Sequence, residues 1–271
     1  MSGSLVCVGI GMTLGAHITP IAKSHIENAD VIFSLVSSGV VEQWVEAMHS
    51  DVRSLQPYYA EGKSRRTTYK EMQDVMLSEV KAGKKVVGVF YGHPGVFAQV
   101  PHNTIKQAKE LGYYAKMEAG ISAEDTLFAD LGIDPGKTGC QHYETSQFMF
   151  FKRNIDTAAH LVLWQVGMAG DQSLEKYTTD SRYRQVLVKL LSTIYPANHE
   201  VILYEAAVLP IESVREERMS LKDLVHAEVS QQTTLVIPPS TKLERNDNIL
   251  DELTTLDAKP DRPNIPLKLV K

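Results

Sequence analysis

The sequence predicts an α/β fold with a mainly parallel sheet in its N-terminal half and a mixed sheet in its C-terminal half. In the first half, short apolar runs alternate with segments of helical periodicity, and this alternation is typical of a parallel, doubly wound sheet. In the second half, three apolar runs are separated by only one long helical segment and a short polar stretch, which favours a mixed sheet.

The elements of the first half can be justified in order along the chain. Residues 5–10 form an apolar run closed by glycine, as in a strand buried on both faces. Further expected elements are a helix over 20–29, a strand over 31–35, helices over 40–48 and 68–82, a strand over 84–89, a helix over 102–111 and a strand over 113–117. A helix over 122–131 has a weak capping signal in Ser122 and Asp125, and Gly132 suits its C-terminal end.

The second half continues with strands over residues 161–165, 200–204 and 233–239 and a helix through residues 174–195. The glycine-containing segment 132–136, followed by residues 139–143, indicates a hinge between two α/β units. We therefore predict an N-terminal domain over 1–136, a C-terminal domain over 137–240 and a polar tail over 241–271. One short helix is expected in the tail, near residues 248–255.

The bulk composition limits the class of protein. The 271 residues are 43% hydrophobic and 23% charged, which is enough to bury a sizeable core. A formal net charge of −5 argues against a dedicated nucleic-acid binder. Cys7 and Cys140 are far apart in the sequence, so neither a disulfide framework nor a cysteine metal site is expected. Without a signal peptide or a membrane-spanning run, we expect a cytoplasmic protein that contacts no membrane.

Two glycine loops follow predicted strands and are candidate ligand-binding turns. Gly9 and Gly11 come after the first strand, but leucine replaces the third glycine of the dinucleotide-binding spacing, so NAD binding is disfavoured. These glycines would serve equally well to turn a strand into a loop. Residues 91–97 are the stronger candidate, because such a turn exposes backbone groups at the carboxyl edge of the sheet. His93 would also fit as a loop histidine with satisfied hydrogen bonds.

The segment from Tyr58 to Tyr69 is the candidate reaction centre. Tyr58 and Tyr59 precede a charged loop, which Arg65 and Arg66 follow. Arg65 and Tyr69 are four residues apart, so they share one face if a helix has begun by then. An exposed amphipathic helix with half-buried tyrosines would show the same spacing, and the spacing does not decide which arginine faces the site.

These motifs together resemble the tetrapyrrole methylase superfamily of S-adenosylmethionine-dependent methyltransferases. The resemblance rests on residues 9–11, 91–97, 118–123 and 204–207 and runs over roughly residues 4–240. It implies a two-domain α/β methyltransferase that forms a homodimer. It also implies that S-adenosylmethionine folds into the cleft between the domains.

Within that superfamily, the sequence is most similar to the borosin α-N-methyltransferases, which methylate backbone amides of a ribosomally made peptide. This similarity rests on the segment from Tyr58 to Tyr69 and on residues 147–151 and 163–165. Fused borosins carry an apolar core peptide at the C-terminus, whereas this sequence ends in a polar segment. The resemblance therefore implies the split type, in which two enzyme chains and two separate precursor peptides form a heterotetramer.

The resemblance assigns site residues position by position. Tyr59, Arg65 and Tyr69 match the catalytic residues, and Tyr58 is a neighbouring candidate. Cofactor contacts are expected at Gly9, Tyr91, His93, Val96, Phe97, Ser122, Ala123, Gln165, Ala206, Thr233 and Thr234. No metal is implied.

The chemistry of an amide explains why such residues are needed. An amide nitrogen is a poor nucleophile because its lone pair is delocalised into the carbonyl. We expect a tyrosine with a pKa lowered by a nearby guanidinium to take the amide proton, while an arginine or second tyrosine donates to the carbonyl oxygen. Positioning and exclusion of water must supply much of the rate. A tetrapyrrole or other small-molecule methyltransferase and a peptide-binding scaffold without catalysis stay open as alternatives.

Overall fold

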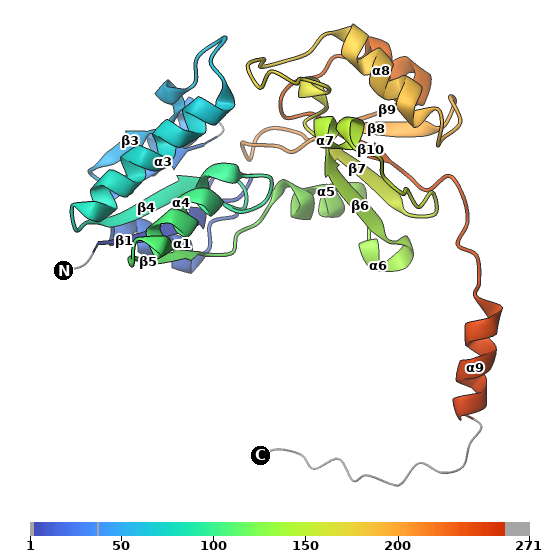
Figure 1. Cartoon of the computed structure of the whole chain (residues 1–271), viewed down its shortest axis with the longest axis horizontal. Coiled ribbons are helices and arrows are strands. Elements are labelled where there is room, and N and C mark those ends of the chain that lie inside the picture. Colours follow the sequence, from blue (N-terminus) through green and yellow to red (C-terminus); the bar gives the residue numbers. More distant parts are fainter. Residues whose placement is uncertain (1–2, 37, 258–271) are drawn as a thin grey trace. The chain divides into compact units, whose positions relative to one another are not determined.

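The computed structural model describes residues 3–36 and 38–257. The chain divides into a compact unit over Met1–Ser240 and a smaller unit over Thr241–Lys271. Within the described part, the larger unit contains two five-stranded sheets, ordered β3-β2-β4-β1-β5 and β6-β7-β10-β8-β9 (Figure 1). The first sheet is wholly parallel and the second is mixed, which confirms the predicted fold class.

The first sheet alternates with helices along the chain. Its strands are β1 Ser4–Gly9, β2 Val31–Leu35, β3 Val52–Ser54, β4 Lys85–Phe90 and β5 Tyr114–Met117. Its helices are α1 Pro20–Glu27, α2 Gly39–Glu46, the short η1 Gln56–Tyr58, α3 Arg65–Lys81 and α4 Gln99–Glu110. Strand β3 was not among the predicted elements, because its three half-buried residues include an arginine and a serine and give no apolar run.

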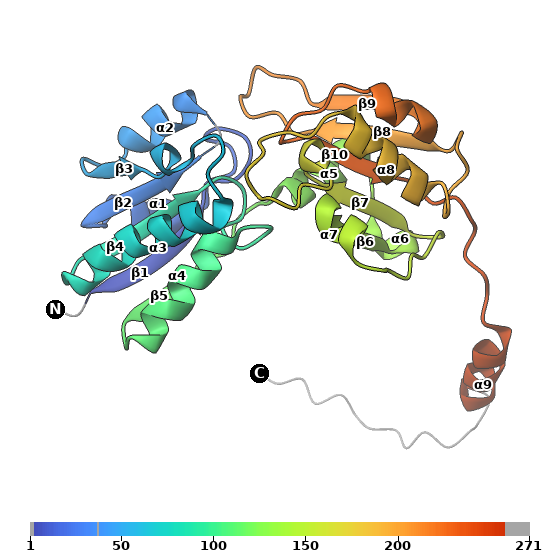
Figure 2. The same cartoon turned by 45° about the horizontal axis from the view of Figure 1, so that its top comes forward.

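Both faces of the first sheet are covered, as the apolar runs predict. Along β1, Leu5 and Cys7 pack with α3 and α4, while Val6 and Val8 pack with α1 and α2. Figure 2 shows these helices around the sheet. Side chains of a strand alternate between faces, so burial on both sides requires a continuous apolar run rather than an alternating one.

The second sheet carries helices on both faces as well. Its strands are β6 Cys140–Glu144, β7 His160–Trp164, β8 Glu200–Glu205, β9 Arg215–Ser220 and β10 Thr234–Ile237. Its helical elements are α5 Ala123–Leu131, α6 Pro135–Thr138, α7 Thr145–Phe150, η2 Val166–Met168, α8 Ser181–Leu191 and η3 Leu221–His226. Side chains of α5 pack on one face, and those of α7, α8 and η3 pack on the other.

Two expectations for the second half were wrong. The segment expected as a hinge over residues 139–143 forms most of β6, which pairs in parallel with β7. The long helix expected over residues 174–195 begins only at Ser181, because Asp180 caps α8 by accepting a hydrogen bond from the Arg182 amide. The domain boundary at residue 136 stays a prediction, although α5 already packs on the second sheet.

The N-terminus of α5 is a capping box. The Ser122 hydroxyl accepts the Asp125 amide at 3.3 Å, and the Asp125 carboxylate accepts the Ser122 amide at 2.7 Å. Aspartate therefore replaces the usual Glu or Gln of this motif. At the other end, Gly132 has a φ of 64°, a left-handed conformation that glycine adopts without strain.

We expect Asp125→Ala to lower the free energy of unfolding by about 1 kcal/mol, because it leaves the Ser122 amide without its acceptor. Denaturant unfolding of the full chain measures this. Glu46→Ala is the matched control, because Glu46 is an exposed carboxylate at the end of α2, and its effect should stay within about 0.5 kcal/mol. Equal effects of the two substitutions would contradict a role for the capping box.

The smaller unit contains α9 Asp247–Asp257, which confirms the short helix predicted near residues 248–255. Its apolar side chains are exposed at Ile249, Leu250, Leu253 and Leu256. In the part of the chain that the structure describes, no helix combines the length and apolar character needed to cross a membrane.

Candidate functional site

The loops after β1, β4 and β5 meet backbone to backbone. A Cβ atom on Gly9 would lie 2.1 Å from the Gly92 carbonyl oxygen, and one on Gly120 would lie 3.4 Å from the Gly9 Cα. Gly11 and Gly92 exchange backbone hydrogen bonds of 3.2 and 2.9 Å, and Gly92 has a φ of 63°. The contact at Gly9 and the positive φ of Gly92 favour glycine, and together with Gly120 these residues form a side-chain-free floor at the carboxyl edge of the sheet.

The turn over residues 91–97 places apolar side chains at the surface of this floor. Tyr91 and Phe97 are each 48% exposed and Val96 is 36% exposed. Phe97 has a φ of 50°, a conformation that residues other than glycine seldom adopt. Its ring lies 5.5 Å from the Trp164 ring at the end of β7. The Nδ1 atom of His93 accepts the Gly95 amide at 2.9 Å, so this imidazole stabilises the turn.

The predicted cofactor contacts at the start of α5 have structural roles. The Ser122 hydroxyl takes part in the capping box, and it also lies 2.8 Å from an Asp125 carboxylate oxygen. Ala123 packs at the edge of the core beneath α5. The backbone near Ser122 lies within 4.0 Å of a Cβ built on Gly92, so the structure does bring this segment to the glycine floor.

The remaining predicted contacts gather at one edge of the second sheet. Gln165, with a φ of 59°, precedes Val166, whose amide donates to the Thr233 carbonyl at 3.0 Å. Thr233 is fully buried and its hydroxyl donates to Glu205. Thr234 is also buried, and it lies opposite Tyr204 where β10 pairs antiparallel with β8.

Glu205 organises this edge, and the sequence analysis did not single it out. Its Oε1 also accepts from Ser230 Oγ at 3.2 Å and from Arg215 Nη1 at 2.9 Å. Glu205 and Ala206 line a cavity of about 530 Å³ together with Ser38 and Val40 of the first half. Glu205 belongs to the motif over residues 204–207, but nothing in the local sequence pattern predicts its partners.

Three tyrosines gather beside the start of α3. The Tyr59 and Tyr69 rings lie 6.4 Å apart, edge to face. Burial raises the pKa of Tyr91, and the nearby Tyr69 raises this pKa further. Tyr58 contributes its carbonyl oxygen, which accepts from Lys63 Nζ at 2.9 Å and from Thr68 Oγ1 at 3.3 Å. The structure therefore joins the predicted reaction centre to the predicted cofactor turn through Tyr91.

The expectation that a guanidinium lowers the pKa of the acting tyrosine is wrong for Tyr59. Burial raises the pKa of Tyr59 well above its usual value of about 10, and the neighbouring Tyr69 and Tyr91 raise the pKa further. Arg65 acts in the opposite direction but does not offset burial. The phenol of Tyr59 therefore keeps its proton at neutral pH.

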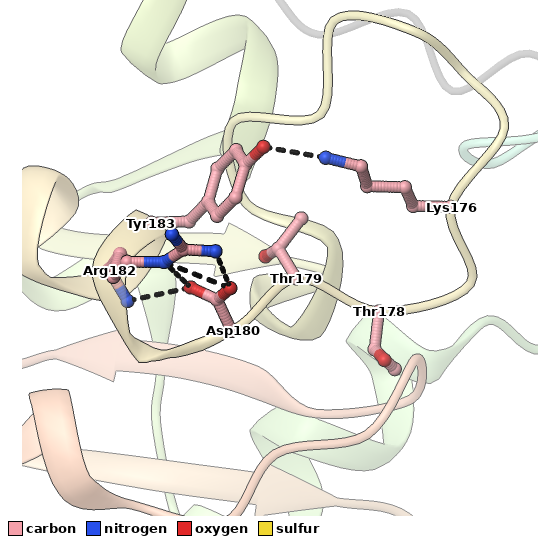
Figure 3. A pocket seen from close by; sticks show the side chains of 6 residues that line it. All are labelled: Lys176, Thr178, Thr179, Asp180, Arg182 and Tyr183. Atoms are coloured by element: carbon pink, nitrogen blue, oxygen red, sulfur yellow. Dashed lines mark hydrogen bonds and ion pairs between the residues drawn. The ribbon is translucent and has the colours of Figure 1, made fainter.

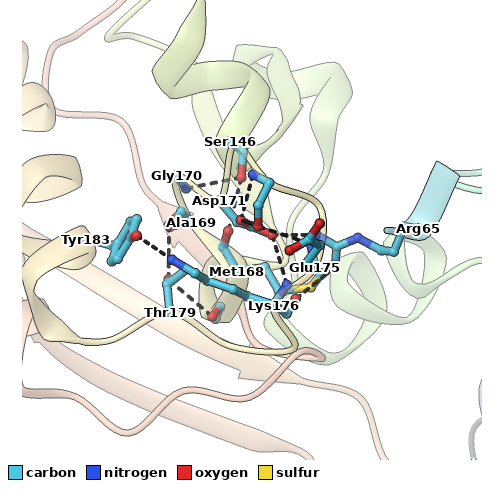
Figure 4. A network of polar contacts seen from close by, with 12 residues as sticks. Arg65, Ser146, Met168, Ala169, Gly170, Asp171, Glu175, Lys176, Thr179 and Tyr183 are labelled. Atoms are coloured by element: carbon cyan, nitrogen blue, oxygen red, sulfur yellow. Dashed lines mark hydrogen bonds and ion pairs between the residues drawn. The ribbon is translucent and has the colours of Figure 1, made fainter. Parts of the chain in front are cut away.

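Arg65, and not Arg66, is engaged in the structure. Arg65 donates from Nη2 to Asp171 Oδ2 at 3.1 Å, and from Nη1 to the Lys176 carbonyl at 3.2 Å and to Met168 Sδ at 2.9 Å (Figure 4). The Arg66 side chain is exposed. The start of α3 is thus tied to the loop over residues 165–180, and Asp171 is a second site residue that the sequence analysis missed.

A cavity of about 420 Å³ lies in the same region of the second half (Figure 3). Lys176 donates to the Tyr183 hydroxyl at 2.6 Å, and Arg182 pairs with Asp180. No predicted catalytic or cofactor-binding residue lines this cavity. The glycine floor and the tyrosines are therefore the better candidate site.

Comparisons with known proteins agree with the resemblance. The model of the tetrapyrrole (corrin/porphyrin) methylases matches residues 4–257. The methyltransferase/ribosomally synthesized cyclic peptide gymnopeptides precursor of Gymnopus fusipes is 40% identical over 96% of this chain and 64% of its own length. The omphalotin A precursor of Omphalotus olearius, also named a methyltransferase, is 38% identical over 95% of this chain and 63% of its own length. The chain thus spans slightly less than two thirds of these relatives.

Solved structures share the fold at low identity. The uroporphyrin-III-C-methyltransferase of Thermus thermophilus has a TM-score of 0.61 and 17% identity, covering 88% of this chain and 93% of its own. A cobalt precorrin-4 methyltransferase has the same TM-score and identity, covering 87% of this chain and 94% of its own. These likenesses show the fold alone.

Proposed function

Because this chain belongs to the tetrapyrrole (corrin/porphyrin) methylase family, we propose that it transfers methyl groups from S-adenosylmethionine to backbone amide nitrogens of a ribosomally made peptide. The relatives support the peptide substrate, because their names join a methyltransferase to a ribosomally synthesized cyclic peptide precursor. The observation that carries the proposal is the cluster of Tyr59, Tyr69 and Tyr91 beside Arg65. It places phenols and a guanidinium next to the glycine floor.

The glycine floor and its surroundings fit S-adenosylmethionine. The absence of side chains at Gly9 and Gly120 lets the loops after β1, β4 and β5 pack backbone to backbone. They form the carboxyl edge of the sheet, where open α/β folds bind ligands. Exposed faces of Tyr91 and Phe97 suit an adenine ring and a sulfonium cation. The buried Nε1 atom of Trp164, beneath Phe97, has no hydrogen-bond partner among the described residues. The unpaired indole donor and the aromatic faces favour a ligand at this surface.

In this proposal, the cofactor supplies an electrophilic methyl group, and the chain holds and activates the amide. Tyr59 keeps its proton and donates a hydrogen bond to the amide carbonyl oxygen. Arg65 adds positive charge there, which stabilises the imidate character that methylation of nitrogen requires. The amide nitrogen would form its N–CH3 bond as the S–CH3 bond of the sulfonium breaks and a neutral thioether leaves. Tyr69 would relay the amide proton, because its oxygen accepts that proton while its own hydroxyl proton passes to water. No metal takes part.

Alignment of the amide must supply a large share of the rate. A phenolate is a far weaker base than an ionised amide, so proton removal cannot run ahead of methyl transfer. Tyr59 and Tyr69 are half buried and pack against the first core, while Tyr91 beside them is exposed. Such an environment excludes water and strengthens the hydrogen bonds to the carbonyl oxygen.

An assay with the full chain tests the function. The protein is incubated with S-adenosylmethionine and a precursor peptide, and the products are sequenced by mass spectrometry. We expect one CH2 increment for each modified residue, located on backbone nitrogens. Methylation of a tetrapyrrole with the peptide left unmodified would refute the proposal, and binding of both ligands without any product would favour a scaffold.

The same assay tests the expected partners. The peptide is supplied as a separate chain, so modification in trans supports the split type. Light scattering and native mass spectrometry of the mixture would show the homodimer and the heterotetramer with two peptide chains. A cytoplasmic location remains a proposal that fractionation of the source cells tests.

A further inference from the structure

The loop over residues 165–180 holds Arg65 from the second half of the molecule. Besides the three side-chain contacts described above, the Arg65 backbone amide donates to the Leu174 carbonyl at 2.9 Å. The Arg65 side chain is only 18% exposed. No acceptor in the described residues contacts its Nε atom, so this donor is free for a substrate carbonyl.

Asp171 is the buried anion of this arrangement. Its side chain is 1% exposed. Its Oδ1 accepts from the amide and the hydroxyl of Ser173 at 3.0 and 2.6 Å, and its Oδ2 accepts from the Lys176 amide at 3.3 Å and from Arg65. Four donors therefore use the four acceptor sites of the carboxylate, and Figure 4 shows Arg65 and Lys176 beside it. Burial raises the pKa of Asp171, but these hydrogen bonds and Arg65 outweigh burial and lower the pKa overall.

The loop that carries Asp171 is itself fixed. The Gly170 amide donates to Ser146 Oγ at 3.1 Å, and that hydroxyl donates to the Met168 carbonyl. Leu174, whose carbonyl accepts from the Arg65 amide, has a φ of 61°. A leucine adopts this strained conformation only where its surroundings enforce it, so the loop presents a rigid acceptor to Arg65.

We propose that Asp171 is a positioning residue, which holds the Arg65 guanidinium in one orientation so that its free Nε donor faces the carbonyl oxygen of the reacting amide. The proposal rests on the proposed function, because it assigns Arg65 to that oxygen. Asp171 does not touch the substrate. A buried ion pair with complete hydrogen bonding fixes a geometry more than it adds stability.

Asp171→Asn removes the charge that holds Arg65 but keeps the size of the side chain. We expect single-turnover methyl transfer to slow by about 100-fold, the scale of a small misplacement of a reacting group, while S-adenosylmethionine affinity changes less than about threefold. In an Arg65→Lys background, Asp171→Asn should add little, because the positioned group is already gone.

Two control variants separate positioning from general structure. Ser173→Ala removes a contact of Asp171 Oδ1 and leaves the Oδ2 contact to Arg65, so its rate should stay within about threefold of wild type. Arg66→Lys changes the exposed neighbour and should have no effect. Thermal melts show that the compared variants are folded. Should Asp171→Asn not fold, Asp171→Glu keeps the charge and displaces the carboxylate, and it should slow transfer to a smaller extent.

Nitrogen-15 NMR of the arginine side chains gives a readout that needs no substrate. Restricted rotation should resolve the two Nη signals of Arg65, which Arg65→Lys identifies by their loss. We expect Asp171→Asn to merge these signals and Ser173→Ala to keep them resolved.

Three results would each overturn the proposal: a wild-type rate in folded Asp171→Asn, additive effects in the double variant, or an equal loss in Ser173→Ala. If the wild-type protein methylates no peptide, the proposed function fails, and the NMR comparison alone decides whether Asp171 holds Arg65.

Discussion

Tyr69→Phe is expected to slow methyl transfer roughly 100- to 10,000-fold, the range that general acid–base catalysis contributes. Tyr69 is half buried, and its ring lies edge to face with Tyr59, so phenylalanine keeps the packing and removes only the hydroxyl. Affinity for S-adenosylmethionine, measured by calorimetry, should stay near that of the wild type.

Tyr113→Phe is the matched control for Tyr69→Phe. Tyr113 also packs against the first core and is half buried, but it lies before β5 and outside the tyrosine cluster. Its rate should equal that of the wild type. Unchanged turnover in Tyr69→Phe would remove Tyr69 from the mechanism.

Gly9→Ala should weaken S-adenosylmethionine binding by at least about tenfold, which corresponds to about 1.4 kcal/mol. The new Cβ would meet the Gly92 carbonyl oxygen at 2.1 Å and Pro94 Cδ at 2.9 Å. Relief requires movement of the turn that carries Tyr91. Overpacking of this kind also costs about 1–3 kcal/mol of unfolding free energy, which denaturant titration measures alongside calorimetric binding.

Gly39→Ala is the control for the loss of a glycine. A Cβ at Gly39, the first residue of α2, meets nothing within 4 Å. Alanine there should raise the unfolding free energy by about 0.4–1 kcal/mol, because it restricts the unfolded chain. Binding should not change. Normal cofactor affinity in a folded Gly9→Ala protein would refute the assignment of the glycine floor as the cofactor surface.

Patterns within one element could be predicted from the sequence, and contacts between distant elements could not. Continuous apolar runs correctly predicted β1, β2 and β4, because burial on both faces of the sheet favours apolar residues at nearly every position of a strand. Polar edge strands such as β3 and β9 contain no continuous apolar run. Loop residues 174–180 have apolar and charged side chains at helical spacing, but Asp180 starts the helix after them.

The candidate site shows the same limit. The pairing of Arg65 with Tyr69 was visible as a spacing of four on one helix. Asp171, which lies 106 positions away from Arg65 along the chain, has no local signature, and neither has the contact of Glu205 with Thr233. The sign of the pKa change at Tyr59 depended on its burial and on Tyr69 and Tyr91, which lie in separate parts of the sequence, and no linear pattern records this.

The start of α3 has a consequence for local stability. Ser64 makes no side-chain cap, the first turn contains no acidic residue, and the helix begins with two arginines. Their charges oppose the partial positive charge of a helix N-terminus. Because the Leu174 carbonyl and the Asp171 carboxylate offset this unfavourable start, the first turn of α3 and the loop over residues 165–180 should open together. Their amides should then exchange with solvent as one cooperative unit.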